Sequence, residues 1–342
     1  MIISDAWVRA KETQAACSAL SAQGFQALFV GGCVRNALLG APVSDIDIAT
    51  DATPEETLNC AKSAGLKAIP TGIEHGTITV VSGGLAHEIT TFRSDVETDG
   101  RHAKVRFSKD IHEDAARRDF TMNALYARSD GTVIDPLSGL ADLKARHVRF
   151  IGDAEARIRE DYLRSLRFFR FTAWYGDTAL GIDGDGLSAV AANLGGIADL
   201  SRERVGSEMK KLLAAPDPAP AIAAMRNCGL LNLVLAGADD KALAPLVHFE
   251  QALGVRPEPI RRLSALADSS CAASLRLSKA ETKRWALLSD EIGAMKSAGH
   301  LGYLYGESTA LEILLLRAVS FETPVTQDQI SGLAIGAAAK FP

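Results

Sequence analysis

The sequence predicts an α+β fold, with an N-terminal α+β domain of about 150 residues followed by an all-helical extension. Three observations support this prediction. Runs rich in β-branched residues and bounded by turn signals alternate with helical patterns near the N-terminus. From residue 154 onward the pattern is helical, and a length of 342 residues is enough for two or three domains.

The composition argues against several classes of protein. Hydrophobic residues make up 47% of the chain and charged residues 23%, which is typical of globular proteins. There is no apolar run of about 18 residues, so no membrane-spanning helix is expected, and the first residues lack the basic and apolar segments of a signal peptide. The five cysteines are scattered without a CxxC pair, which disfavours a disulfide framework or a cysteine zinc site and favours the cytoplasm.

The first elements follow from helix and turn signals. Residues 5–23 predict a helix that Gly24 ends, and the next run, FQALFV, predicts a buried strand. The runs GTITVV and LAHEITTF surround the turn sequence SGG and predict a β-hairpin. The polar segment TDGRHAK predicts a mobile loop.

Helical patterns dominate the chain after this point. The run AEARIREDYLRSLRFFRFTAWYG has good helix formers and no proline, so it predicts one helix that Gly176 ends. The run ERVGSEMKKLLAA predicts a second helix, which PDPAP breaks. Ser278 and Glu281 form a capping box that starts a later helix.

The first candidate binding feature is the glycine pair in FVGGCVRNALLG. Two glycines after a strand let the backbone turn sharply and approach a ligand closely. The helix that opens there offers free N–H groups to a phosphate, and Arg35 in its first turn could add a bidentate contact. The same pattern also fits an ordinary strand–helix turn with a surface arginine.

The second feature is the acidic pair in VSDIDIAT. Alternation along a strand places Asp45 and Asp47 on one face and the two isoleucines on the other. Such close carboxylates stay ionised together when a cation lies beside them, and hard oxygen ligands suit Mg²⁺, which also takes substrate phosphates as ligands. A solvated polar strand face is the alternative.

Glu88 in AHEITTF is a candidate third carboxylate for a metal site. The alternative is an ordinary exposed strand residue or a hydrogen-bonding neighbour of the ligands. His75 and His87 have no second histidine at ligand spacing, so we expect them to be structural or surface residues.

A basic region lies in the middle of the chain. Residues 101–170 hold 15 Lys and Arg against 11 Asp and Glu, although the whole chain has a net charge of −5. This favours local phosphate contacts over binding along a polyanion, but an imbalance of this size is also a common fluctuation. Within the region, ARRDFTMNAL places Arg118 beside Asp119, which could orient the guanidinium; a surface ion pair is the alternative.

The segment EDYLRSLRFFR carries four further candidates. Asp161 and Arg164 are one helical turn apart on one face of the predicted helix, and Arg167 and Arg170 continue the same row. By spacing alone, a salt-bridged structural helix is the better explanation of this pattern.

Taken together, these motifs resemble the bacterial and eukaryotic-type (class II) tRNA nucleotidyltransferases, the CCA-adding enzymes. The resemblance extends from about residue 28 to 215, just over half of the chain, and its strength lies in the order and spacing of the motifs. They are VGGCVRNALLG, DIDIAT, HGTITVV, HEITTFRSD, DGRHAKVRF, EDAARRDFTMNAL, IDPLSGLADL, REDYLRSLRFFRF and SRERVGSEMKKLL. The remainder matches loosely, through LRLSKAE.

The resemblance implies a fold and an activity. The fold would be a nucleotidyltransferase-superfamily head with a small mixed sheet and helices over residues 1–150, a nucleotide-selecting helical neck over 151–215, and a tRNA-binding helical body and tail over 216–342. The activity would be template-independent addition of C, C and A from CTP and ATP to the 3′ end of tRNA, with Mg²⁺ as cofactor and release of pyrophosphate.

The resemblance also implies roles for individual residues. Asp45 and Asp47 would be the catalytic metal carboxylates. Triphosphate and nucleotide contacts would come from Gly32, Arg35, Arg118, Asp161, Arg164, Arg167 and Arg170. SDVETDGRHAK would correspond to the family's flexible loop. One position departs from the family pattern, because Asn36 stands where an aspartate is usual.

Selection of C and A without a nucleic-acid template has a physical basis. Both bases present an exocyclic amine beside an unprotonated ring nitrogen, so a carboxylate can accept from the first and a guanidinium can donate to the second. U and G mismatch both contacts. Asp161 and Arg164 would supply this pair.

Three other activities fit parts of the pattern. A bacterial poly(A) polymerase shares the head, but KAIPTGIEHGTITVV fits the CCA-adding pattern better. An enzyme that adds only CC or only A, and a non-catalytic RNA-binding relative, are the remaining alternatives; the acidic pair disfavours the last.

Overall fold

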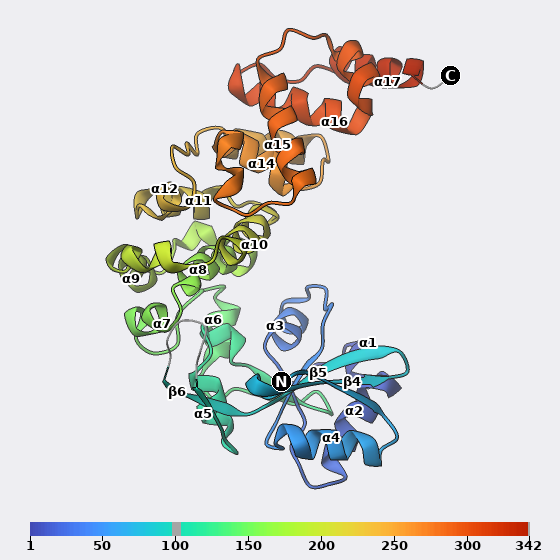
Figure 1. The fold of residues 1–342 in the computed structure, drawn as a ribbon, viewed down its shortest axis with the longest axis vertical. Coiled ribbons are helices and arrows are strands. Elements are labelled where there is room, and N and C mark those ends of the chain that lie inside the picture. Colours follow the sequence, from blue (N-terminus) through green and yellow to red (C-terminus); the bar gives the residue numbers. More distant parts are fainter. Residues whose placement is uncertain (98–103, 341–342) are drawn as a thin grey trace. The chain divides into compact units, whose positions relative to one another are not determined.

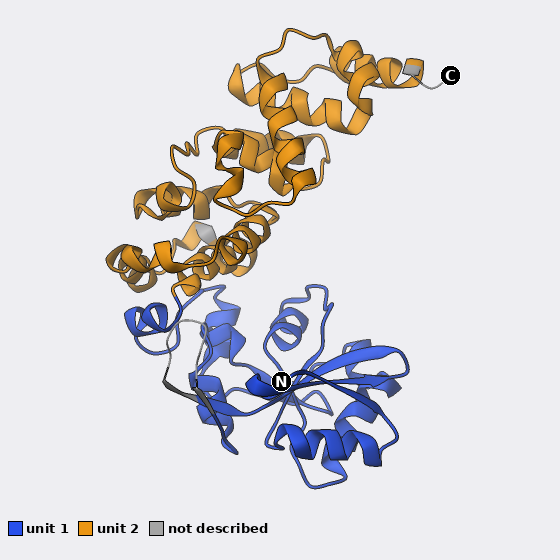
Figure 2. Cartoon of the chain, viewed as in Figure 1, with its two compact units in different colours: residues 1–161 blue, residues 162–342 orange. Residues whose placement is uncertain are grey.

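The computed structural model describes residues 1–97 and 104–340, which form two compact units, residues 1–161 and 162–342 (Figures 1 and 2). The segment that corresponds to TDGRHAK lies almost entirely outside the described residues. The first unit includes one helix beyond residue 150. The division into head, neck and body stays a prediction.

The first unit is built on a mixed seven-stranded sheet with the order β3-β4-β5-β2-β1-β8-β9. β2 and β5 are parallel, and the other neighbouring pairs are antiparallel. The strands are β1 (Leu28–Val30), β2 (Asp47–Thr50), β3 (Lys67–Gly72), β4 (Thr77–Ser82), β5 (Leu85–Thr91), β8 (Tyr126–Arg128) and β9 (Val133–Ile134); β6 (Arg93–Glu97) and β7 (Lys104–Phe107) form a separate hairpin. The predicted α+β class is confirmed.

The predicted hairpin around SGG is the pair β4 and β5. Ser82 pairs with Leu85, and both glycines between them have positive φ, 55° at Gly83 and 87° at Gly84, which favours a two-residue hairpin turn. Neighbouring residues of β5 point to opposite faces of the sheet. His87 is fully buried on one face, where its Nε2 lies 3.2 Å from Thr13 Oγ1, so it is structural as expected.

Helices of the first unit surround this sheet. α2 and α4 lie next to each other on the face that His87 points to (Figure 1). α4 begins with a capping box, in which Thr53 Oγ1 accepts from the Glu56 amide and the Glu56 side chain accepts from the Thr53 amide. The helices are α1 (Ala6–Arg9), α2 (Lys11–Ser21), α3 (Gly32–Leu39), α4 (Pro54–Ser63), α5 (Ile111–Ala116), α6 (Gly139–Lys144) and α7 (Ala154–Glu160), with 3-10 turns η1 (Ile73–His75) and η2 (Thr121–Asn123).

The prediction of one helix over residues 5–23 was wrong, because the chain is extended at Ala10 (ψ 131°), between α1 and α2. The break is stabilised by a tertiary contact. The Gln14 side-chain amide donates to the Val8 carbonyl at 2.6 Å and to the Ser129 carbonyl at 2.8 Å. A long-range hydrogen bond of this kind has no signal in a local pattern.

The described part of the second unit is helical throughout, as expected. Its helices are α8 (Leu163–Tyr175), α9 (Gly184–Ala192), α10 (Arg202–Leu213), α11 (Ala219–Asn227), α12 (Leu230–Val234), α13 (Leu243–Ala252), α14 (Pro259–Leu266), α15 (Lys279–Ile292), α16 (Ala298–Ser320) and α17 (Gln327–Lys340), with 3-10 turns η3 (Thr178–Leu180), η4 (Leu194–Asp199) and η5 (Ser269–Ala273). The predicted capping box starts α15. Within the described residues, none of the helices is long and apolar enough to cross a membrane.

The predicted single helix from 154 to Gly176 is also wrong. α7 ends at Glu160 and α8 begins at Leu163, with Asp161 in an extended conformation (φ −155°, ψ 104°). The run contains no helix breaker. Instead the Tyr162 ring lies where a side chain on Gly196 would be, since an ideal Cβ there would be 2.2 Å from the ring. Tertiary packing therefore accompanies a break that helix propensity does not predict.

A cluster of buried charges connects helices of the second unit. Glu250 in α13 is 1% exposed and accepts hydrogen bonds from Arg261 Nε at 2.8 Å and from Arg262 Nε at 2.9 Å. Arg262 also donates to the carbonyls of Leu213 and Ala215 at the end of α10. Arg261 forms a second ion pair with Glu312 in α16 at 3.1 Å. Through these two arginines of α14, the cluster joins α13 to the end of α10 and to α16.

We predict that Glu250→Gln lowers the free energy of unfolding by about 3–5 kcal/mol, because it removes the negative charge between two buried guanidiniums. Urea-induced unfolding of the full chain measures the change. The matched control is Glu203→Gln, which removes one partner of an exposed ion pair with Arg276 (3.4 Å, side chains 63% and 70% exposed). The control should change the free energy by less than about 1 kcal/mol; equal effects in the two variants would contradict the prediction.

Candidate active site

The candidate site lies where three neighbouring strands of the first unit begin or end. β1 ends at Val30 beside Tyr126, the first residue of β8. β2 begins at Asp47 and runs antiparallel to β1, so its start lies beside the end of β1. The glycine pair follows β1 directly. The predicted phosphate turn and the predicted metal carboxylates therefore meet where β1 ends and β2 begins.

Gly31 makes the turn from β1 into α3. Its φ of 69° lies in the left-handed region that favours glycine, and it is the N-cap residue of α3. A Cβ at Gly31 would lie 3.4 Å from Arg118 Nη1, so the missing side chain lets the guanidinium approach the backbone. Gly32, the predicted triphosphate contact, is the first residue of α3. The backbone N–H groups in the first turn of α3 therefore lie near Arg118.

The acidic pair lies at the start of β2. The strand begins at Asp47 rather than Asp45, but the predicted alternation persists, since Ile46 and Ile48 are buried while Asp45 is exposed and Asp47 half-buried. Ser44 Oγ donates to Asp45 Oδ2 at 2.9 Å. The two carboxylates are near enough to interact electrostatically.

Charges and burial act on Asp47 together. Burial raises its pKa, the negative charges of Glu88 and Asp45 raise it further, and Arg118 acts in the opposite direction. Asp47 and Glu88 are register partners on the parallel strands β2 and β5. Asp47 is thus partly removed from water and lies near two like charges. A bound cation would offset both unfavourable effects.

The donor set fits one hard divalent cation. Asp45 and Asp47 provide carboxylate oxygens on adjoining positions, the ligand type that Mg²⁺ takes together with water and phosphate oxygens. Among the described residues, no group of three or more His, Cys, Asp or Glu side chains is arranged to hold a metal ion. A role for Glu88 as third ligand stays a prediction.

Arg35 is buried, with 6% of its surface exposed. Its Nε and Nη2 donate to Asn36 Oδ1 at 3.2 and 2.9 Å, and its Nη1 donates to Asn123 Oδ1. Asn36 Nδ2 donates to the carbonyl of Pro42 at 2.8 Å. The asparagine thus keeps the acceptor that an aspartate would offer to Arg35 and adds a donor to the loop that leads to Asp45.

Arg118 is held by Asp114 and Tyr126. Its Nη2 donates to Asp114 Oδ2 at 3.0 Å and its Nε donates to Tyr126 Oη at 3.2 Å. The expectation that Asp119 orients this guanidinium was wrong. Asp119 Oδ1 instead accepts from the Phe120 amide and from Asn123 Nδ2 at 2.9 and 2.8 Å.

The remaining candidates lie at and beyond the end of the first unit. Asp161 is the last residue of that unit, and Arg164 lies in the first turn of α8 in the second, so they do not share one continuous helix. Arg167 and Arg170 both lie over the Phe171 ring, at 5.3 and 4.5 Å from its centroid.

Arg170 also has a strong partner within the second unit. Its Nε contacts Glu208 Oε2 at 2.6 Å, with the two side chains 14% and 6% exposed. The structural alternative considered for this row of arginines, a salt-bridged helix, therefore describes Arg170 well.

Sequence reasoning missed three residues of the site: Asp114, Asn123 and Tyr126. Asp114 had a usable signal, because it precedes Arg118 by four residues, the spacing of an i,i+4 ion pair. Asn123 and Tyr126 had none, since sheet pairing and the 3-10 turn η2 bring them into place.

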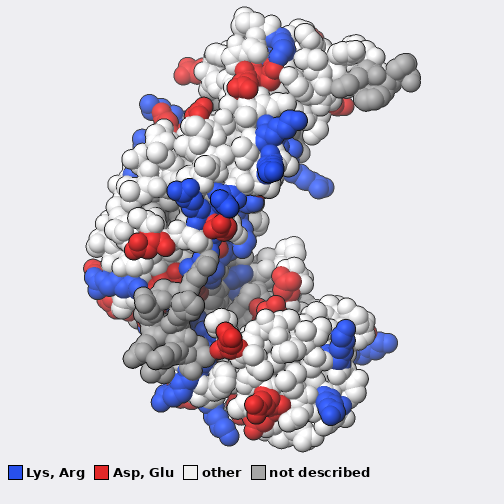
Figure 3. All heavy atoms as spheres, in the orientation of Figure 1, with Lys and Arg blue, Asp and Glu red and all other residues white. Residues whose placement is uncertain are grey.

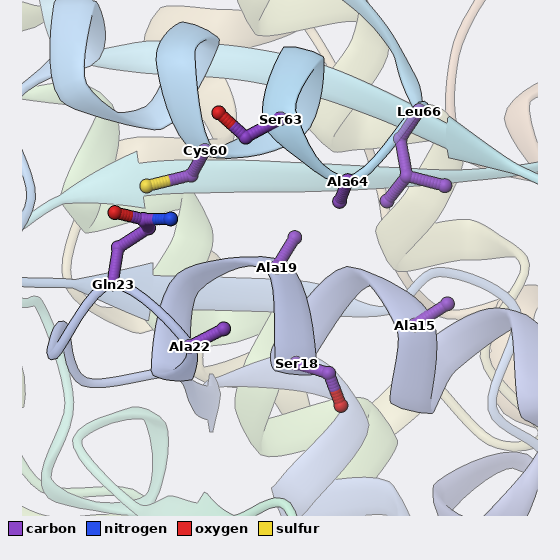
Figure 4. A pocket seen from close by; sticks show the side chains of 9 residues that line it. All are labelled: Ala15, Ser18, Ala19, Ala22, Gln23, Cys60, Ser63, Ala64 and Leu66. Atoms are coloured by element: carbon purple, nitrogen blue, oxygen red, sulfur yellow. The ribbon is translucent and has the colours of Figure 1, made fainter.

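A pocket of about 310 Å³ lies elsewhere in the first unit, between α2 and α4 (Figure 4). Its lining is uncharged and mostly small, and includes Ser18, Gln23, Cys60 and Ser63. It contains none of the predicted site residues, and it lies beside the helices on the sheet face opposite Glu88.

Comparisons with known proteins find two matching domain families and several similar proteins. The Poly A polymerase head domain family matches residues 27–149, and the family described as the probable RNA and SrmB-binding site of polymerase A matches residues 180–241. The CCA-adding enzyme of Geobacillus thermodenitrificans is 39% identical over 280 residues, 81% of this chain and 62% of that protein. The mitochondrial CCA tRNA nucleotidyltransferase 1 of Homo sapiens is 47% identical over 184 residues, 54% of this chain and 42% of that protein.

The chain thus spans less than two thirds of the length of these curated relatives. Among solved structures, the Bacillus stearothermophilus CCA-adding enzyme in complex with CTP superposes with a TM-score of 0.75 at 29% identity, covering 96% of this chain and 82% of that one. A tRNA nucleotidyltransferase complexed with a primer tRNA and an ATP analog, at 22% identity and a TM-score of 0.72, shares the fold. Residues 27–149 therefore belong to the Poly A polymerase head domain family, and over 81% of its length the chain is similar to a CCA-adding enzyme.

Proposed function

We propose that this chain is a template-independent RNA nucleotidyltransferase that adds C, C and A from CTP and ATP to the 3′ end of tRNA. The observation that carries the proposal is the grouping of Asp45, Asp47 and Arg118 beside the Gly31 turn. The curated relatives are named CCA-adding enzymes or CCA tRNA nucleotidyltransferases, and one solved neighbour holds CTP. These names favour CCA addition over poly(A) synthesis.

Asp45 and Asp47 would hold a Mg²⁺ ion. When bound, the ion would supply Lewis-acid charge at the RNA 3′-hydroxyl and at the α-phosphoryl group. The chain's own contribution is to hold both carboxylates on adjoining positions, with Arg118 limiting the rise in the pKa of Asp47.

The glycine turn and Arg118 would bind the triphosphate. The N–H groups at the start of α3 and the Nη1 of Arg118 face the same region, which suits phosphate oxygens. The RNA 3′-oxygen then attacks the α-phosphorus in line, the bond to the β-phosphate breaks, and pyrophosphate leaves. The protein's part in this step is positioning and charge.

Asp161 and Arg164 would read the base, as a carboxylate acceptor for the exocyclic amine and a guanidinium donor to the ring nitrogen. The second unit would bind tRNA phosphates. Lys and Arg side chains gather along part of the face of this unit that Figure 3 shows. Such contacts are sensitive to salt.

We also infer a cytoplasmic location. The five cysteines are free and scattered, and three of them, Cys17, Cys33 and Cys60, are buried. Burial raises the pKa of Cys17 to about 12 and that of Cys33 to about 11, so these thiols stay protonated and act as small core residues.

The test of the proposal is incorporation of labelled CTP and ATP with Mg²⁺ and tRNAs that end before, within or after the two C residues. Addition of C, C and A that then stops supports it. A long A tail identifies a poly(A) polymerase, addition of only CC or only A identifies a partial enzyme, and no incorporation with retained tRNA binding identifies a binding protein.

Asp47→Asn should reduce the incorporation rate by about 10³-fold or more, because a metal carboxylate is lost, while tRNA binding stays unchanged. Rates are measured over a Mg²⁺ titration, with filter binding of tRNA in parallel. Asp5→Asn is the control, since Asp5 is exposed and makes no capping hydrogen bond. Incorporation by Asp47→Asn within tenfold of wild type would exclude Asp47 as a metal ligand.

Asp161→Ala should lower the discrimination of CTP over UTP by about tenfold or more, since one base contact is worth about 1–3 kcal/mol. The ratio of kcat/KM values for CTP and UTP measures this effect, and the KM for the triphosphate should change less. The control is Asp185→Ala, an exposed residue of α9. If Asp161→Ala selects bases as wild type does, another residue reads the base.

A further inference from the structure

We propose that Asp114 and Tyr126 are positioning residues that lock the Arg118 guanidinium so that its Nη1 faces the triphosphate turn. The inference rests on the proposed function and deepens it, because it assigns work to two buried side chains that the mechanism above does not use. Asp114 is 1% exposed and Tyr126 is fully buried.

The three side chains form a closed ring of hydrogen bonds. Tyr126 Oη donates to Asp114 Oδ2 at 2.7 Å, and the same oxygen of Asp114 accepts from Arg118 Nη2 at 3.0 Å. Arg118 Nε donates to Tyr126 Oη at 3.2 Å, which closes the ring. The guanidinium therefore has two of its three nitrogens fixed by two partners that lie in the core.

The third nitrogen points to the glycine turn. Nη1 lies 3.4 Å from the position that a Cβ on Gly31 would occupy. Among the described residues, the hydrogen-bond acceptors of Arg118 are Asp114 and Tyr126, and both are used by Nε and Nη2. The donors on Nη1 thus face the start of α3 with their hydrogen-bonding capacity available.

The ring is stable over the pH range in which the protein would work. Burial raises the pKa of Asp114, but the charges of Arg118 and Arg117 outweigh it and lower the pKa to about 2. Burial also raises the pKa of the Tyr126 hydroxyl well above its ordinary value. Asp114 therefore stays an acceptor and Tyr126 stays a donor.

Arg117 makes the arrangement more rigid. Its Nε donates to Asp114 Oδ1 at 2.9 Å, so each oxygen of the carboxylate has a guanidinium partner. An arginine whose fork is fixed in advance loses less conformational freedom when it binds a phosphate. The hydrogen bonds around Arg118 would thus keep its orientation toward a bound phosphate within narrow limits.

Tyr126→Phe is the sharpest test, because it keeps the ring in the core and removes only the hydroxyl. We expect the KM for ATP to rise by about tenfold with a smaller change in kcat, since a binding contact is loosened. The matched control is Tyr305→Phe, which removes a tyrosine–carboxylate hydrogen bond of 2.8 Å to Glu291 in the second unit. The control should leave KM unchanged, and the melting temperatures show whether either variant is merely destabilised.

A double-mutant cycle separates positioning from packing. In an Arg118→Ala background, Tyr126→Phe should raise KM no further, because its effect passes through Arg118. Additive effects on KM, or an unchanged KM in Tyr126→Phe alone, would overturn the proposal.

Equilibrium binding of ATP and AMP keeps this test separate from that of the proposed function. Tyr126→Phe should weaken ATP binding and leave AMP binding unchanged, since Arg118 would contact the β- and γ-phosphates. This result would support the positioning role even if wild type incorporates no nucleotide. Equal ATP binding by wild type and Tyr126→Phe would overturn it, and a wild type that does not bind ATP would overturn both proposals.

Discussion

Repulsion between neighbouring carboxylates is the constraint on which the candidate site in the first unit depends. Asp47 and Glu88 lie in register on two parallel strands, and Asp45 adds a third negative charge nearby. These carboxylates repel one another. The hydrogen bonds of the sheet and the buried isoleucines on either side of Asp47 nevertheless hold them close together. The fold therefore supplies a place where positive charge is favourable, whether it comes from a cation or from Arg118.

The position of Arg118 follows from the same constraint. Its guanidinium lies near the carboxylate of Asp47 and beside Gly31, which has no side chain to exclude it. A freely rotating arginine would settle on the carboxylates and neutralise them. Because Asp114 and Tyr126 hold its other nitrogens, the charge of Arg118 acts on Asp47 from a fixed position. The groups proposed to bind metal and the groups proposed to bind phosphate can then remain separate within a small volume.

Local sequence patterns were sufficient for the elements that depend on local chemistry. The hairpin at Gly83 and Gly84, the capping box at Ser278 and the acidic pair at the start of β2 are all short-range signals, and the structure contains each of them. The two helix predictions that failed involve contacts distant in sequence. The helix breaks at Ala10 and at Asp161 coincide with contacts from Gln14 to Ser129 and from Tyr162 to Gly196.

The same distinction applies to the site. The residues that touch substrate in the proposal carry recognisable chemistry in a recognisable order, so sequence could nominate them. The residues that hold them in place, Asn123 and Tyr126, come from other elements and have no pattern of their own. Asp119 was nominated as the partner of Arg118 because it is adjacent in sequence, but on α5 the residue one helical turn earlier has the better geometry.

The carboxylate of Glu250 between two buried arginines has an evolutionary consequence. Replacing Glu250 alone leaves two buried guanidiniums without the carboxylate that they share, whereas a joint replacement of all three residues by apolar residues of similar volume is tolerated far better. The three positions are therefore epistatic: the effect of a change at Glu250 depends on the residues at positions 261 and 262, and lineages without Glu250 should lack the two arginines as well.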